Sequence, residues 1–183
     1  MNFCSDCGAT VSKRVPEGDN RERYVCDDCG AIHYQNPRII TGCLATYEDK
    51  VLLAKRAIEP RSGFWTLPAG FLENGETASA GAARETMEEA CAVVEIIDLY
   101  TVFSLPHISQ MYCFYRATLP EPSYGVGPES TDVGLFTRDE IPWDELAFPV
   151  VRDTLDHFFN DRDRGHFEMR AKDLLFKPRR PKP

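Results

Sequence analysis

Residues 70–91 read GFLENGETASAGAARETMEEAC, and this stretch decides the fold. Its first part contains glycine and asparagine, which favour a turn, and Thr77 then offers an N-cap for a helix that we expect to end near Ala90. Small side chains recur on one face of this helix, so that face can pack closely on a sheet. The stretch therefore predicts a loop followed by a helix that lies on a β-sheet.

The polar face of the predicted helix carries three carboxylates. Glu85, Glu88 and Glu89 stand at relative positions 0, 3 and 4, on one face and within about 6 Å of axial rise. Like charges this close repel each other, but they are favourable where hard divalent cations such as Mg²⁺ or Mn²⁺ lie between them and a phosphate. Arg84 can hold one of these carboxylates through paired hydrogen bonds. A solvated helix face is the alternative.

The segments on both sides of this stretch predict a sheet. Residues 39–47 and 51–54 are rich in apolar and β-branched side chains and flank a turn at 48–50, so they predict a hairpin. Further strands are expected at 64–67, 93–97, 99–104, 110–118 and 132–136, and an amphipathic helix at 153–159. The basic, proline-containing end at 177–183 is typical of a solvated tail.

Four of the seven cysteines form two copies of the pattern Cys-x-x-Cys-Gly. The pairs are Cys4 with Cys7 and Cys26 with Cys29, and 18 residues separate the two pairs. Four thiolates complete a closed tetrahedral site that suits Zn²⁺ in a structural role, whereas a redox function needs only one pair. Residues 1–36 contain few large aliphatic side chains, so we expect a zinc ribbon in which the ion replaces a core.

The composition limits the partners and the location of the chain. A net charge of -8 opposes nonspecific attraction to nucleic acid or anionic membranes. No apolar stretch approaches the roughly 20 residues of a membrane span, and the N-terminus lacks a signal pattern, so we expect a cytoplasmic location. The remaining cysteines, Cys43, Cys91 and Cys113, are expected to be inert packing thiols.

The spacing of the acidic and glycine residues resembles the signature of the Nudix hydrolases. Gly70, Glu76, the pair 84–85 and the pair 88–89 match that signature, and the preceding run WTLPAGF at 65–71 is similar to its lead-in. Two positions depart from it: Thr86 stands where an aliphatic residue is usual, and Cys91 replaces the closing glycine. We expect Cys91 to shift the exit of the helix, because glycine adopts a left-handed backbone at lower cost.

The resemblance extends over nearly the whole chain and implies an α/β (α+β) fold. We expect an alpha/beta/alpha sandwich with a mixed sheet, preceded by the small zinc ribbon. The expected division is residues 1–36 for the ribbon, 37–165 for the Nudix domain and 166–183 for a C-terminal tail. A homodimer is expected by resemblance alone.

The resemblance also implies a role for each residue of the signature. The expected ligands of the catalytic Mg²⁺ or Mn²⁺ are Glu85, Glu88, Glu89 and the backbone carbonyl of Ala69. Arg84 would orient Glu85, and Glu76 would brace the loop. Glu129, in a later loop, is the candidate general base, with a surface acid as the alternative.

The substrate implied by the resemblance is a small dinucleotide, FAD or ADP-ribose, which hydrolysis would convert to AMP and a second monophosphate. NADH pyrophosphatases are the close alternative, but they carry the element SQPWPFP after the signature, whereas residues 104–112 here read SLPHISQMY. The candidate substrate contacts are Arg56 and Arg61 for phosphate, and Phe64, Tyr112 or Phe114 for stacking on a ring.

A noncatalytic nucleotide- or nucleic-acid-binding protein on a Nudix scaffold is the alternative of another class. The retention of every carboxylate of the signature speaks against it. Residues 1–38 hold five basic and six acidic side chains, so the ribbon has no excess positive charge to follow a phosphate backbone. We therefore expect no nucleic acid and no membrane among the partners.

Overall fold

The computed structural model describes residues 1–175, and the basic end predicted at 177–183 lies outside the described residues. The chain divides into two compact units, Met1–Pro37 and the part from Arg38 onward. Among the described residues, no helix is both long enough and apolar enough to cross a membrane.

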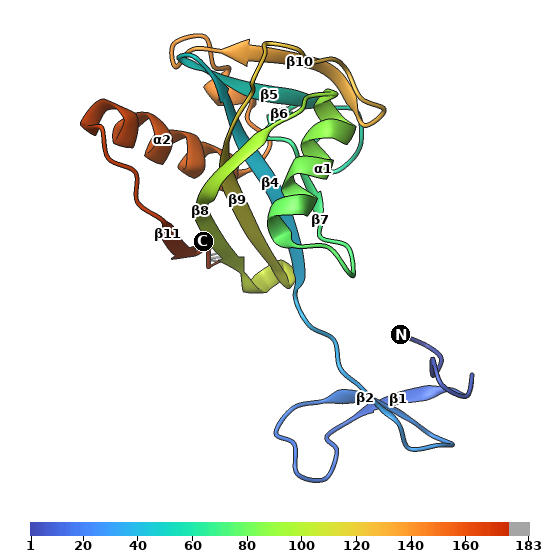
Figure 1. Cartoon of the computed structure of the whole chain (residues 1–183). Coiled ribbons are helices and arrows are strands. Elements are labelled where there is room, and N and C mark those ends of the chain that lie inside the picture. Colours follow the sequence, from blue (N-terminus) through green and yellow to red (C-terminus); the bar gives the residue numbers. More distant parts are fainter. Residues whose placement is uncertain (176–183) are drawn as a thin grey trace, which may run out of the picture. The chain divides into compact units, whose positions relative to one another are not determined.

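The first unit is a small antiparallel sheet of three strands (Figure 1). They are β1 (Val11–Arg14), β2 (Arg23–Cys26) and β3 (Ile32–His33), in the order β1-β2-β3. The buried apolar residues of this unit are Cys4, Val25 and Cys26, so its interior consists mainly of cysteine. A sheet this small cannot bury enough apolar surface to be stable by that means alone.

The second unit contains one mixed sheet and two main helices (Figure 1). The helices are α1 (Ala78–Ala90) and α2 (Pro149–Arg164), with short 3-10 turns at Pro106–Ile108 and Trp143–Glu145. The strands are β4 (Arg38–Tyr47), β5 (Lys50–Arg56), β6 (Trp65–Thr66), β7 (Ala69–Phe71), β8 (Glu95–Leu105), β9 (Gln110–Thr118), β10 (Ser130–Phe136) and β11 (Arg170–Asp173).

The central strands follow the order β10-β5-β4-β9-β8-β11, with β6 paired to β5 and β7 paired to β4. The pairs β4–β9 and β8–β11 are parallel, and the other pairs are antiparallel. The sheet is therefore mixed, as the resemblance implies.

Alternating side chains of the sheet build a separate core on each face. In β4, Leu44 packs with Val151 and Phe159 of α2, whereas its neighbours Cys43 and Ala45 pack with the alanines of α1. This alternation follows from the two-residue period of a strand. The helices consequently cover opposite faces, as Figure 1 shows, and the predicted sandwich with its preceding ribbon is confirmed.

Several elements differ from the sequence prediction. The strands expected at 93–97 and 99–104 form the single strand β8, whose register shifts twice, between Ile96 and Asp98 and between Leu99 and Thr101. These irregularities disturb the alternation of apolar residues, which is why the sequence suggests a break there. The short strand β7 lies in a stretch predicted as turn, and β11 was not predicted at all.

Candidate active site and metal centres

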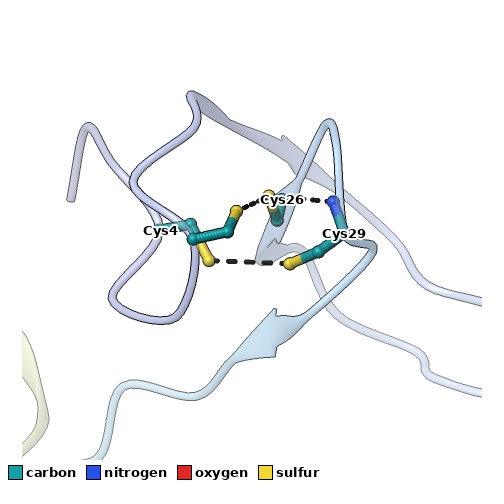
Figure 2. A group of neighbouring side chains, drawn as sticks. Cys4, Cys26 and Cys29 are labelled. Atoms are coloured by element: carbon teal, nitrogen blue, oxygen red, sulfur yellow. Dashed lines mark hydrogen bonds between the residues drawn. The ribbon is translucent and has the colours of Figure 1, made fainter.

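The four paired cysteines of the ribbon converge on one point. Their sulfur atoms all lie within 4.8 Å of one another, with 3.8 Å between Cys4 Sγ and Cys29 Sγ and 3.4 Å between Cys7 Sγ and Cys26 Sγ. Figure 2 shows Cys4, Cys26 and Cys29 pointing toward each other. Tetrahedral zinc with Zn–S bonds of about 2.3 Å needs sulfurs about 3.8 Å apart, so the cluster fits Zn²⁺.

Backbone N–H groups favour the thiolate form that zinc requires. The amides of Cys29 and Asp28 each donate to Cys26 Sγ at 3.4 Å, and they lower the pKa of Cys26 to about 6. His33 Nε2 lies 3.2 Å from Cys4 Sγ, a contact that the sequence analysis did not anticipate. A ring nitrogen in this place can donate to a zinc-bound sulfur and orient it.

In the second unit, α1 presents its carboxylates to the sheet beside β7. Thr77 caps the helix by accepting a hydrogen bond from Ala80 N at 3.2 Å. Glu85 and Glu89 are only 8% and 6% exposed, and Ala69 N donates to Glu89 Oε2 at 3.2 Å. Burial raises the pKa of Glu89 to about 7, and burial also raises the pKa of Glu85. Two buried carboxylates so close together are costly without cations to offset their charge.

Arg84 holds the site together through five hydrogen bonds. Its guanidinium donates to Glu85 Oε1 at 2.7 Å and to Glu88 Oε2 at 3.1 Å. It also donates twice to the carboxylate of Glu76, at 2.8 and 3.1 Å, and to Phe71 O at 3.1 Å. The bonds from Arg84 lower the pKa of Glu76 to about 2. Arg84 therefore connects the loop that precedes α1 with two carboxylates of the helix.

Two glycines allow this close packing. A Cβ atom on Gly70 would lie 2.3 Å from Glu85 Oε2, and one on Gly127 would lie 1.8 Å from Glu88 O. A larger residue at Gly70 would displace the carboxylate of Glu85, and one at Gly127 would displace the backbone of α1 at Glu88. The glycines thus permit the backbone of β7 and of the loop before β10 to approach α1.

The carboxylates border a cavity of about 1490 Å³. Glu129 also lines this cavity, and its negative charge contributes to raising the pKa of both Glu85 and Glu89, so it lies near them. The cavity exceeds the roughly 300–1,000 Å³ of common small-molecule sites. The cavity therefore has room for a ligand larger than a typical small molecule.

Comparisons with known proteins agree with this geometry. The family model described as Nudix N-terminal, a zinc ribbon, matches residues 2–35, and the model of the NUDIX domain matches residues 36–158. The chain belongs to the Nudix family. A solved Nudix hydrolase from Nitrosomonas europaea is similar over 96% of this chain and 100% of its own, with a TM-score of 0.94 and 52% identity.

Curated relatives are more distant. An NAD-capped RNA hydrolase NudC of Vibrio vulnificus (strain CMCP6) is 33% identical over 150 residues, which cover 78% of this chain and 53% of the relative. An ADP-ribose pyrophosphatase of Methanocaldococcus jannaschii is 34% identical over 99 residues, or 54% of each chain. The chain thus spans about half the length of the curated relatives it matches.

The departures from the Nudix signature are accommodated locally. Thr86 is fully buried and donates to Ala82 O at 2.8 Å, so its hydroxyl is satisfied within α1. Cys91 adopts the left-handed conformation itself, with φ 46° and ψ 34°, and its N–H donates to Met87 O at 2.9 Å. The expectation that the helix exit is shifted is therefore wrong. Cys91 is also exposed, so it is not the packing thiol that the sequence suggested, whereas Cys43 is buried.

Only some of the residues that we predicted to contact the substrate line the cavity. Arg56 and Tyr112 line it, whereas Arg61 and Phe64 do not. These two residues face each other instead, with the Arg61 guanidinium 5.3 Å from the centre of the Phe64 ring. The stacking candidate Phe114 reaches the cavity but is 1% exposed, because it belongs to the core.

Arg56 is held at the cavity by one group close to it in the sequence and one far from it. Its Nε donates to Pro60 O at 2.9 Å, and its guanidinium stacks 5.3 Å from the centre of the Phe148 ring. Burial raises the pKa of Tyr112, and the charge of Arg56 partly offsets this effect, so the two side chains are near neighbours. Sequence analysis did not single out Phe148, because this residue reaches the site from the N-cap of α2, far away in the chain.

Proposed function

We propose that the chain is a metal-dependent pyrophosphohydrolase that cleaves a nucleoside diphosphate linkage. The observation that carries this proposal is the buried pair Glu85 and Glu89, which lies with Glu88 at the edge of a cavity large enough for a dinucleotide. Carboxylate oxygens in this arrangement are ligands that Mg²⁺ and Mn²⁺ prefer. The chain's membership of the Nudix family supports the same reaction class.

The residues around the cavity have separable tasks in this proposal. The three carboxylates of α1 and the carbonyl of Ala69 would hold divalent cations, which when bound neutralise a diphosphate and lower the pKa of a water molecule. Arg84 keeps Glu85 and Glu88 oriented, and Arg56 offers guanidinium N–H groups to a phosphate oxygen. Glu129 accepts the proton of the attacking water.

We infer that the substrate is FAD or ADP-ribose, and that hydrolysis releases AMP and a second monophosphate. The similarity to a relative named ADP-ribose pyrophosphatase supports this choice. Residues 104–112 also lack the element that NADH pyrophosphatases carry after the signature.

An NAD-type diphosphate is the second candidate. The relative that aligns with 78% of this chain is named an NAD-capped RNA hydrolase. An RNA that carries such a cap therefore joins the candidate partners, although the sequence analysis expected no nucleic acid.

The test is a substrate panel with product identification. Full-length protein is incubated with Mg²⁺ or Mn²⁺ and with FAD, ADP-ribose, NADH or an NAD-capped RNA, and the products are separated by chromatography. We expect metal-dependent release of AMP from FAD or ADP-ribose, or of the corresponding monophosphates from an NAD-type substrate.

Matched variants show whether the proposed residues are responsible. Glu89→Gln is expected to lower kcat/KM more than about a hundredfold, because even the outer partners of metal sites contribute about 10- to 100-fold. Glu129→Gln is expected to lower kcat by about 10²- to 10⁴-fold with little change in KM. The control Glu95→Gln alters an exposed carboxylate outside the cavity and should keep the parent activity. Failure of the parent on all four substrates, or equal activity of Glu89→Gln, contradicts the proposal.

A further inference from the structure

Strand β11 lies beyond the residues that the model of the NUDIX domain matches. The family match ends at residue 158, and β11 begins at Arg170. The strand runs parallel to β8, from the pair Arg170–Thr101 to the pair Asp173–Ser104. Leu174 N then donates to Ser104 O at 2.9 Å, so the ladder continues beyond the strand itself.

A buried ion pair fixes β11 against the end of α2. Arg170 donates to both carboxylate oxygens of Asp161, which is 1% exposed. Tyr100 OH donates to the same carboxylate at 2.8 Å, and Lys172 pairs with Asp153 at 2.6 Å. A satisfied buried charge of this kind defines a single position for the strand, because breaking it would leave a charge unpaired.

This position carries the chain to the proposed active-site cavity. Asp173, Leu174 and Leu175 all line the cavity. Leu174 packs against the core cluster of that face, whereas Leu175 remains 71% exposed. Ile108, in the turn between β8 and β9, lines the same cavity and is 45% exposed. Exposed apolar side chains that gather on a cavity wall are typical of a binding surface.

The wall lies far from the carboxylates. Strand β7, next to the carboxylates, is followed across the sheet by β4, β9, β8 and β11. Counted along the sheet, four spacings of about 4.8 Å separate β11 from β7 by about 19 Å. A group bound against Leu174 and Leu175 is therefore a part of the substrate remote from the diphosphate. Apolar leucines suit the face of a planar ring, which needs no hydrogen-bond partner there.

We propose that Leu174 and Leu175 bind the second ring of a two-ring dinucleotide, so that β11 makes the enzyme prefer flavin or nicotinamide dinucleotides to ADP-ribose. This inference rests on the proposed function. All the candidate substrates share adenosine, so only contacts to the other half can discriminate among them. ADP-ribose has no ring base in that half and gains nothing from an apolar wall.

The test compares substrates within each variant. Leu175→Asp changes an exposed side chain and should leave folding intact, and Leu174→Ala is the second variant. For FAD or NADH, kcat/KM is expected to fall about tenfold through KM, in the range of about 10- to 200-fold known for apolar pocket contacts. For ADP-ribose it should change less than about twofold. The control Met169→Asp alters an exposed apolar residue just before β11 that does not line the cavity, and should match the parent.

The outcomes separate this inference from the proposed function. A parent that hydrolyses neither a dinucleotide nor ADP-ribose contradicts the proposed function itself. An active parent whose variants keep the parent's kcat/KM for every substrate shows that β11 is not a binding wall. Equal losses for FAD and ADP-ribose show that the wall holds the shared adenosine half, and a parent specific for ADP-ribose also overturns the inference. Melting temperatures close to that of the parent exclude unfolding as the cause of a loss.

Discussion

Each of the two units of this chain contains a cluster of chemically similar side chains, and the two clusters differ in their place in the fold. In the ribbon, the ligand cluster is itself the interior, because Cys4 and Cys26 are two of its three buried apolar residues. In the Nudix unit, the carboxylates lie beside a sheet that has an apolar core on each face. The comparison suits our proposal that one ion stabilises a fold, whereas the ions proposed at the carboxylates serve a site on a fold that is already stable.

Removal of zinc should have the largest effect, and the two units should respond to it differently. Chelation, or the substitution Cys26→Ser, is expected to unfold residues 1–37, because structural zinc contributes an apparent binding free energy of about 10–16 kcal/mol. The Nudix unit should keep its own thermal transition. Zinc content per chain, calorimetry and the amide signals of the ribbon measure these outcomes.

The matched control for this experiment is Cys91→Ser. It removes an exposed thiol outside the cluster and should change neither the zinc content nor the folding of the ribbon. Amide signals of a folded ribbon at zero zinc content would show that the thiols do not depend on an ion.

The guanidinium of Arg84 lies among the carboxylates, and its replacement should have the next largest effect. Arg84→Lys keeps the charge but loses the planar fork that reaches Glu76 and Glu85 together. We expect kcat/KM to fall about 10- to 100-fold, as for other groups that orient metal ligands. Steady-state kinetics at increasing Mg²⁺ measure this effect, and excess metal should restore part of the activity.

The control is Arg138→Lys, which alters a solvent-exposed pair with Asp163. This variant should match the parent, because exposed ion pairs contribute about 0–1 kcal/mol. If Arg84→Lys also matched the parent, the guanidinium fork would have no positioning role.

The cysteine cluster and the proposed carboxylate site could both be predicted because their residues are close in the sequence. One turn of helix sets Glu85, Glu88 and Glu89 on a single face, and each cysteine pair closes within its own turn. The helix α1 and its cap at Thr77 follow from equally local signals. The fold class follows from these elements and from the alternation of apolar residues in the strands.

The rest of the cavity depends on contacts that no local pattern contains. Leu174 reaches it only because β11 pairs with β8, about seventy residues earlier in the chain. Arg56 and Arg61 look alike in the sequence, yet Arg56 stacks on Phe148 at the cavity and Arg61 stacks on Phe64 outside it. Tertiary packing decides which of these side chains lies at the cavity, so a local sequence pattern does not predict it.

The smallest predicted effect concerns the end of α1, where the signature has glycine. Cys91 adopts φ 46° and ψ 34°, a left-handed conformation that costs a residue with a Cβ atom about 1–2 kcal/mol. Its side chain is exposed, so Cys91→Gly loses little packing. Glycine also has a more disordered unfolded state, which offsets part of the gain.

We therefore expect Cys91→Gly to raise the free energy of unfolding of the Nudix unit by up to about 1 kcal/mol. Cys91→Ser removes the thiol but keeps the strained backbone, so it should stay within about 0.5 kcal/mol of the parent. Urea unfolding followed by tryptophan fluorescence measures both, since both tryptophans lie in the Nudix unit. A lower free energy of unfolding for Cys91→Gly than for Cys91→Ser would contradict this prediction. The free-energy cost of the left-handed backbone at Cys91 would then be smaller than the entropic stabilisation that glycine gives the unfolded chain. The absence of glycine would then have no cost in this member of the family.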